Sequence, residues 1–308
     1  MKRSSMLTTN NSDQDPKISI IIPTYNRAVM LMEAINSVLN QDYENWELII
    51  VDNFSTDETD KLIGELSDVR IRYIKTPRTG SVAASRNLGI SMATGNWVAF
   101  LDSDDLWAPT KLSTVIPIME LGYELIFHAL IIMNEKNPKV RYRAPQRIRI
   151  KSPIYFNLLL NGNVISLSSV VLKKIYLDTI GGMNESKELY ALEDYDAWLR
   201  ISRLTENFFY IRKFLGSYRV HDSNISQGNN FAYVTRGLES HLKSLSRNQR
   251  RRFDGLYIYK EVAHQIKERD FSHIIKKLFF AIRYAPLKYS IRLLIQLPQA
   301  LMASVFTK

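Results

Sequence analysis

Segments with strand-like and helix-like patterns alternate along residues 17–101, and this alternation restricts the possible folds more than any other feature of the chain. Short apolar or alternating stretches predict strands at 17–22, 46–51, 69–73 and 97–101. Apolar residues at helical spacing predict helices over 31–38 and 82–93. Repeated strand–helix units form a mostly parallel sheet flanked by helices, so we expect a Rossmann-like α/β domain.

Polar residues follow three of these predicted strands. Residues 23–27 follow the first strand, Asp52 and Asn53 follow the second, and residues 102–105 follow the fourth. In parallel sheets ligands bind where the carboxyl ends of the strands meet. We therefore expect the three polar loops to converge on one crevice.

The third of these loops holds the carboxylates of Asp102, Asp104 and Asp105 within four residues. Charges this close repel one another unless a cation lies among them. Mg²⁺ and Mn²⁺ prefer oxygen ligands and commonly bridge protein carboxylates to substrate phosphates. The run therefore indicates half of a metal–diphosphate site, although a solvated acidic turn before the helix expected near Pro109 is the alternative.

Composition sets the size and class of the protein. A chain of 308 residues with 45% apolar residues can form one large or two modest domains around a real core. Cysteine is absent, which excludes disulfide scaffolds and thiolate metal sites and fits a reducing cytoplasm. Residues 1–16 are polar, lack the apolar stretch of a secretory signal, and are expected to form a flexible arm.

The basic excess of the chain lies entirely in its last quarter. Residues 231–308 hold 15 basic and 5 acidic residues, which accounts for the whole formal charge of +10. Six apolar residues there recur at helical spacing and form one stripe: Phe271, Ile274, Ile275, Leu278, Ile282 and Ala285. Three basic residues lie on the opposite side: Lys276, Lys277 and Arg283. This pattern suits an anionic membrane surface, or else the stripe packs on the catalytic domain.

Four sequence segments carry a resemblance to a known family. They are IIPTYNR at 21–27, IIVDNFSTD at 49–57, SRNLG at 85–89 and LDSDD at 101–105. In this order and spacing they resemble the signatures of glycosyltransferase family 2, of the bacterial surface-polysaccharide type. The resemblance implies a glycosyltransferase A fold, a nucleoside-diphosphate-sugar donor, a divalent metal and inversion at the anomeric carbon. It also implies a catalytic domain over 17–230, with a nucleotide-sugar half (17–108) and an acceptor half (109–230), followed by a basic helical region (231–308).

The resemblance assigns roles in donor binding position by position. Asp102 is expected at the ribose, Asp104 on the metal, and Tyr25 against the base. Asn53 stands where the family often has a second Asp that reads uracil, and its amide can still both accept and donate hydrogen bonds. Arg86 could approach the phosphates or pair inside the fold. The full set of expected donor-binding residues is Pro23, Tyr25, Arg27, Asp52, Asn53, Arg86, Asp102 and Ser103.

The second half of the domain is expected to supply the base. Glu193 and Asp194 precede an amphipathic helix, where they could simply cap its first turn. An inverting transfer needs a carboxylate or His that deprotonates the acceptor hydroxyl, and the resemblance points to Asp194 within this catalytic pair. His221, in the run YRVHD, resembles a family residue that completes the metal shell or contacts the diphosphate.

These expectations combine into one function. The chain should transfer a hexose (glucose, galactose or an N-acetyl derivative) from a UDP-sugar, with Mn²⁺ or Mg²⁺, onto a polyprenyl-diphosphate-linked saccharide in O-antigen, capsule or exopolysaccharide assembly. It should act in the cytoplasm, peripherally on the inner face of the cell membrane. A non-catalytic sugar-nucleotide-binding protein is the alternative. A nucleic-acid-binding protein is disfavoured, because no recognition module accompanies the basic tail and such a protein needs no clustered carboxylates.

Overall fold

The computed structural model describes residues 15–77, 80–134, 141–143, 150–221, 231–267, 274–287, 289–295 and 298. Residues 1–14 of the expected N-terminal arm lie outside this described part of the chain. The strands are β1 (Ile18–Thr24), β2 (Trp46–Asp52), β3 (Ile71–Lys75), β4 (Trp97–Phe100), β5 (Leu106–Trp107), β6 (Leu125–Asn134), β7 (Arg141–Arg143), β8 (Val171–Lys173) and β9 (Phe208–Val220). The helices of the α/β part are α1 (Ala28–Leu39), α2 (Thr59–Gly64), α3 (Val82–Met92), α4 (Lys111–Glu120), α5 (Ile154–Asn161), α6 (Lys174–Thr179) and α7 (Glu193–Ile201), with 3₁₀ turns η1 (Leu167–Ser169) and η2 (Lys187–Leu189).

All strands belong to one mixed sheet with the order β3-β2-β1-β4-β8-β6-β9-β5, and β7 pairs with β6. The longer ladders are parallel: β1 pairs with β2 and β4, β2 with β3, and β6 with β9. The short strands β5, β7 and β8 pair antiparallel with their neighbours. The expected mostly parallel sheet is confirmed. The predicted third strand starts later than expected, because Val69 is exposed and the strand begins at Ile71.

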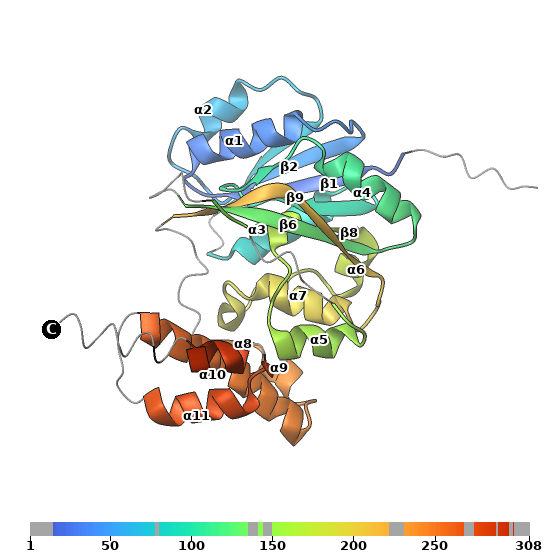
Figure 1. Cartoon of the computed structure of the whole chain (residues 1–308). Helices are drawn as coiled ribbons and strands as arrows, with labels where there is room; N and C mark the ends of the chain where they lie inside the picture. The colour runs from blue at the N-terminus through green and yellow to red at the C-terminus, as the bar shows by residue number, and fades with distance from the viewer. Residues whose placement is uncertain are drawn as a thin grey trace, which may run out of the picture.

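Helices cover both faces of the sheet. Figure 1 shows α1, α2 and α4 on one face and α3, α6 and α7 on the other. Every residue of β1 is buried, and its isoleucines divide between two apolar clusters: Ile20 packs toward α1, whereas Ile21 joins the cluster that includes α7. Burial on both faces explains why this strand is a continuous apolar run without alternation.

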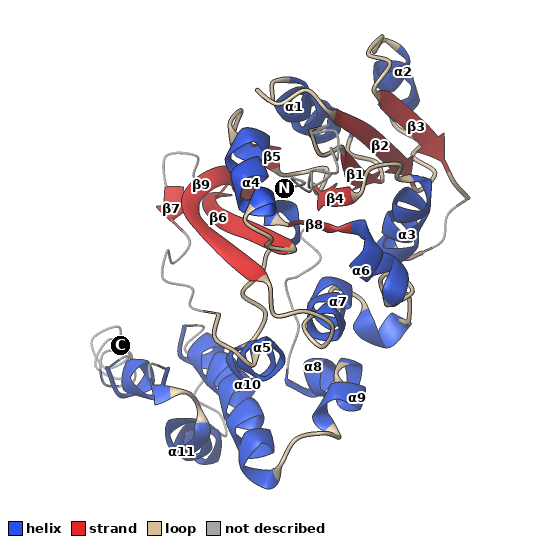
Figure 2. Cartoon of the chain, turned by 90° about the vertical axis from the view of Figure 1, so that its right-hand side faces the viewer, coloured by secondary structure: helices blue, strands red, loops and turns tan. Residues whose placement is uncertain are grey.

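The C-terminal region is helical, as expected, and lies beyond α5 on the α7 side of the sheet (Figures 1 and 2). Its helices are α8 (Phe231–Gly237), α9 (Glu239–Leu242), α10 (Arg247–Lys267) and α11 (Ile274–Tyr284). Residues 289–295 form a further helical stretch. A Cβ on Gly255 would lie 2.6 Å from the backbone nitrogen of Ala285, so α10 approaches the end of α11 at a position that only glycine fits.

The apolar stripe of α11 faces α10. Ile274, Leu278 and Ala281 are buried with Val262 and Ile266 of α10 in one apolar cluster. The stripe expected to face a membrane, or else to pack on the catalytic domain, instead packs on α10 within the C-terminal region itself. Phe271 of that stripe lies outside the described residues, as does the side chain of Ile275. In the described part of the chain, every helix is too short or too polar to cross a bilayer.

Candidate active site

A cleft of about 1040 Å³ opens at the carboxyl ends of β1, β2 and β4 and is closed on its far side by the N-terminus of α7. Its lining includes ten of the twelve residues that the sequence predicted: Pro23, Tyr25, Arg27, Asn53, Arg86, Asp102, Ser103, Asp104, Glu193 and Asp194. The other two predicted residues, Asp52 and His221, lie behind the lining. The three polar loops thus converge, as expected from the sheet topology.

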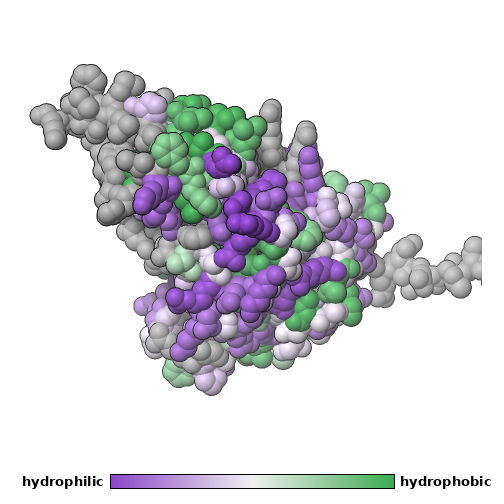
Figure 3. Space-filling view, turned by 90° about the horizontal axis from the view of Figure 1, so that it is seen from below, coloured by the Kyte–Doolittle hydropathy of each residue, from purple (hydrophilic) through white to green (hydrophobic). Residues whose placement is uncertain are grey.

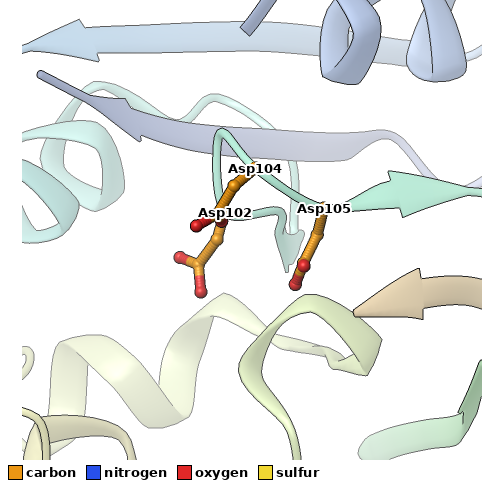
Figure 4. A group of neighbouring side chains, drawn as sticks. All are labelled: Asp102, Asp104 and Asp105. Carbon is orange, nitrogen blue, oxygen red and sulfur yellow. The ribbon is translucent and has the colours of Figure 1, made fainter. Parts of the chain in front are cut away.

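The acidic turn between β4 and β5 gathers three carboxylates. One oxygen from each of Asp102, Asp104 and Asp105 lies within 4.8 Å of the others (Figure 4). Burial and the neighbouring carboxylates raise the pKa of Asp105 well above its usual range. Burial, with the charge of Asp104, also raises the pKa of Asp102, although Arg86 opposes the shift. A cluster of three carboxylates whose burial and mutual repulsion raise two of their pKa values fits a hard divalent cation, which prefers oxygen donors.

Asp104 connects this turn to two other parts of the chain. Its Oδ2 is ion-paired with Arg27, which follows β1, and lies 2.8 Å from Nε2 of His221 at the end of β9. Both the Asp104 and His221 side chains are buried. The sequence-predicted metal residues are therefore brought together, 117 positions apart in the chain.

Asp105, the third carboxylate of the acidic turn, holds β9 in place. Its Oδ1 accepts the backbone N–H of Arg219 at 3.0 Å, next to the short ladder between β5 and β9. Since His221 is two residues further on, this contact fixes the part of β9 that carries it.

Behind the turn lies a buried lysine, Lys111. Its Nζ donates to the carbonyl of Ser168 at 3.0 Å and lies 3.4 Å from the ring centre of Trp107. Burial lowers its pKa well below the usual range. The hydroxyl of Ser168 accepts the backbone N–H of Asp102 at 3.1 Å, so η1 anchors the start of the acidic turn.

Arg86 of α3 joins the two walls of the cleft. Its Nη2 donates to Asp102 at 2.7 Å and its Nη1 donates to Glu193 at 2.6 Å. Although burial alone would lower it, these two charges raise the pKa of the guanidinium. Of the two roles left open for Arg86, the structure shows the pairing inside the fold, with the side chain also lining the cleft.

Asp194 differs from its neighbour Glu193. Burial and the nearby Glu193 charge raise the pKa of Asp194 to about 7, although Arg86 partly opposes the shift. Its Oδ2 accepts a hydrogen bond from the Asn163 amide at 3.2 Å, whereas Glu193 is engaged by Arg86. A carboxyl that titrates near neutral pH suits general base catalysis, because its ionised form then accepts a proton efficiently.

One end of the cleft lies over β1 and β2, where the sequence predicted residues that contact a base. Tyr25 is 37% exposed in the lining, as a ring that stacks on a base needs to be. Asp52 is fully buried and accepts hydrogen bonds from the Ser55 backbone at 3.0 Å and the Tyr73 hydroxyl at 2.6 Å. Its side chain therefore supports the loop, while Asn53 lines the cleft.

Three non-glycine residues around the cleft adopt positive φ angles. They are Asn26 (49°), Phe54 (67°) and Ala191 (60°). Such backbone conformations are costly and concentrate at functional sites. All three lie in loops that lead into the cleft or line it, which supports its functional role.

Sequence reasoning missed one wall of the cleft. This wall consists of the loop 163–167, residues 190–191 and Tyr218. Residues 163–167 come from a part of the chain without a charge cluster or a family signature, whereas 190–191 and Tyr218 lie close in sequence to the predicted residues Glu193 and His221.

The chain matches the family model "Glycosyl transferase family 2" over residues 19–178. Among curated relatives, the putative colanic acid biosynthesis glycosyl transferase WcaA of Escherichia coli K12 is 34% identical over 61% of this chain and 66% of its own length. The UDP-Glc:alpha-D-GlcNAc-diphosphoundecaprenol beta-1,3-glucosyltransferase WfaP of Escherichia coli is 31% identical over 79% of this chain and 92% of its own length.

Solved structures share the fold. The crystal structure of TarS 1-349 from S. aureus in complex with UDP-GlcNAc superposes with a TM-score of 0.65, over 89% of this chain and 82% of that one, at 15% identity. The mannosyltransferase PcManGT from Pyrobaculum calidifontis, in complex with GDP-Man and Mn²⁺, gives a TM-score of 0.54 over 96% of this chain and 77% of that one, at 17% identity. The fold is glycosyltransferase A, and the chain belongs to glycosyltransferase family 2.

Proposed function

We propose that this protein transfers a hexose from a UDP-sugar, with inversion and with the help of Mn²⁺ or Mg²⁺, to a hydroxyl of a polyprenyl-diphosphate-linked saccharide. One observation carries the proposal: a single cleft holds an acidic turn on one side and, on the other, a carboxyl whose pKa is raised to about 7. Carboxylates with different environments in one site are the pattern expected when one group holds charge and another moves a proton.

The donor half positions the leaving group. Tyr25 lies against the base, Asn53 reads it, and Asp102 accepts from the ribose. Asp104, with His221 beside it, and Asp102 offer the oxygen and nitrogen atoms that hold a divalent ion, which neutralises the diphosphate when bound. Arg27 remains close to Asp104 and adds positive charge at the same end of the cleft.

The acceptor half activates the nucleophile. The ionised carboxylate of Asp194 takes the proton of the acceptor hydroxyl as the oxygen bonds to the anomeric carbon. The bond from that carbon to the diphosphate oxygen breaks on the opposite side, and UDP leaves with the electron pair. Attack opposite the leaving group inverts the anomeric centre. Glu193 keeps Arg86 in place between the two halves.

The relatives guide the choice of substrates. Two of them, WfgD and WfaP, are named as enzymes that take UDP-Glc and GlcNAc-diphosphoundecaprenol, and WcaA is named for colanic acid biosynthesis. We therefore propose UDP-glucose as the first donor to examine and a lipid-diphosphate-GlcNAc as the acceptor. Such an acceptor places the protein in the cytoplasm, peripherally on the inner face of the cell membrane, in the assembly of O-antigen or a similar polysaccharide.

A donor and acceptor screen tests this function. Release of the nucleoside diphosphate is measured for UDP-Glc, UDP-Gal and their N-acetyl forms, and as GDP for the control donor GDP-mannose. Each donor is used with and without a synthetic lipid-diphosphate-GlcNAc and Mn²⁺. We expect release with one UDP-sugar that depends on the acceptor. A protein that binds UDP-sugars in calorimetry but releases no UDP with any pairing would instead be the non-catalytic sugar-nucleotide-binding protein.

A further inference from the structure

The C-terminal helices expose an apolar face that is distinct from the stripe buried against α10. Four exposed residues lie at helical spacing on one face, with exposed fractions of 75% for Leu287, 47% for Ile291, 58% for Leu294 and 55% for Ile295. Phe279 of α11 is 70% exposed. The opposite side of the same stretch, with Ser290 and Leu293, is buried. This helical stretch therefore packs on the protein through one side and exposes apolar side chains to solvent on the other.

The concentration of these residues is unusual within the described part of the protein. Outside the cleft, the remaining large exposed apolar residues stand singly, such as Leu121, Ile175 and Leu204. Isolated exposed apolar residues are normal, whereas a group of them marks a contact surface. We call the group formed by Leu287, Ile291, Leu294 and Ile295 the apolar face.

The charge around the apolar face is of one sign. The sequence has no acidic residue after Asp270, and residues 271–308 carry six basic ones. Among these, Lys276, Arg283 and Arg292 are exposed. Figure 3, a view onto the side of the molecule where the C-terminal helices lie, shows hydrophobic and strongly hydrophilic areas next to one another. Exposed apolar side chains with basic neighbours complement an anionic lipid surface, into which such a helix sinks its apolar residues.

We propose that the apolar face docks this protein onto an anionic lipid bilayer. The inference rests on the proposed function in one respect, since a polyprenyl-linked acceptor is itself held in a membrane. It narrows the expectation drawn from the sequence, which covered the whole basic tail, to Leu287, Ile291, Leu294 and Ile295. The stripe of Ile274 and Leu278 instead holds the helix to α10.

Vesicle cosedimentation of the full chain tests the docking. We expect binding to vesicles of phosphatidylethanolamine with phosphatidylglycerol, weak binding to phosphatidylcholine vesicles, and loss of binding as salt rises. The triple change Leu287→Gln, Ile291→Gln and Leu294→Gln should lower the partition coefficient at least about tenfold, since these side chains lose the transfer of apolar surface from water. The control, Leu121→Gln with Ile175→Gln, removes exposed apolar residues elsewhere and should bind as the parent does.

A charge variant measures the electrostatic contribution to vesicle binding. Arg283→Gln with Arg292→Gln should weaken binding to anionic vesicles about fivefold for each residue. The control, Lys61→Gln with Lys213→Gln, removes the same charge at exposed positions elsewhere and should have little effect. Circular dichroism and melting curves show that each variant remains folded. Equal sedimentation of the triple variant and its control would overturn the proposal.

Two further results would also overturn the proposal. In the first, the parent protein does not bind anionic vesicles. In the second, the parent protein is a dimer that binds no vesicles, and the triple variant is a monomer. The second result would assign the apolar face to a second copy of the chain. Failure of the proposed function is recognised separately. If docking is right and the function wrong, the vesicle results hold while no donor and acceptor pair releases UDP. If both are right, the triple variant keeps its rate on a water-soluble acceptor and loses rate only on the acceptor in vesicles.

Discussion

At the scale of single residues, the two adjacent carboxylates at the start of α7 have different surroundings. Glu193 is held by Arg86, whereas Asp194 accepts from Asn163 and has a pKa raised to about 7. The choice of Asp194 as the base, which the sequence left to a family resemblance, thus gains a physical reason. Its role in catalysis is still a prediction that substitutions must test.

Replacing Asp194 should slow the chemical step and leave UDP binding intact. Asp194→Asn keeps the shape of the side chain but cannot take a proton, so we expect the transfer rate to fall by about 10² to 10⁴ fold. UDP affinity, measured by calorimetry, should stay near that of the parent. A parental rate for Asp194→Asn, together with a lost rate in a folded Glu193→Gln variant, would move the base to Glu193.

The pKa of Asp194 predicts a pH dependence. Its carboxyl is protonated below about pH 7 and cannot accept the acceptor proton, so kcat/KM should rise with pH and level off above about 7. Initial rates, measured at saturating metal at pH values below and above 7, give this pH dependence of kcat/KM. A profile that stays flat down to about pH 5 would show that the base is a group with an ordinary carboxyl pKa.

Residue roles were predictable from the sequence where charge clusters or signatures marked them. Asp104 and His221 were named and do meet. The direct partner of Arg86 was left open, because a single Arg on a helix face does not reveal which distant carboxylates it will reach. Lys111 and Ser168 could not be identified, since their roles depend on burial and on backbone contacts that no local pattern encodes.

At the scale of elements, Arg86 connects α3 to the acidic turn and to α7. Strands β1, β2 and β4 were predictable because burial on both faces leaves apolar runs, and β3 was predictable from the alternation of its apolar residues. The strands β5, β7 and β8 have two or three residues each and were not predicted, since such short segments carry no periodicity. The C-terminal stripe was recognised as amphipathic, but the surface it contacts depends on α10, which the sequence does not place.

Breaking the Arg86 connection should destabilise the domain. Arg86→Met leaves the buried Glu193 and the partly buried Asp102 without their shared cation, which should cost about 3 kcal/mol in the free energy of unfolding. The control, Lys174→Met, breaks a more exposed pair with Asp178 one helical turn away and should cost less than about 1 kcal/mol. Urea unfolding measures both. Equal losses for the two variants would mean that Arg86 contributes little to joining the cleft walls.

At the scale of the whole molecule, one sheet brings together loops from both halves of the chain. The parallel strands β1, β2 and β4 end at the cleft, and β9 returns beside β5 to carry His221 to the acidic turn. The fold class was predictable from alternation and from the ordered signatures. The wall formed by 163–167 was not, because it depends on how η1 packs against that turn.

The most direct test of metal-dependent transfer in this cleft is the rate at which labelled hexose moves from a UDP-sugar to the lipid-linked saccharide as Mn²⁺ is titrated. The parent protein should be inactive in excess EDTA and recover with added Mn²⁺, because the diphosphate then no longer faces Asp102 and Asp104 without a cation. Asp104→Ala should stay inactive at every Mn²⁺ concentration while remaining folded. Full transfer by the parent in excess EDTA, or by Asp104→Ala, would contradict the assignment of the acidic turn.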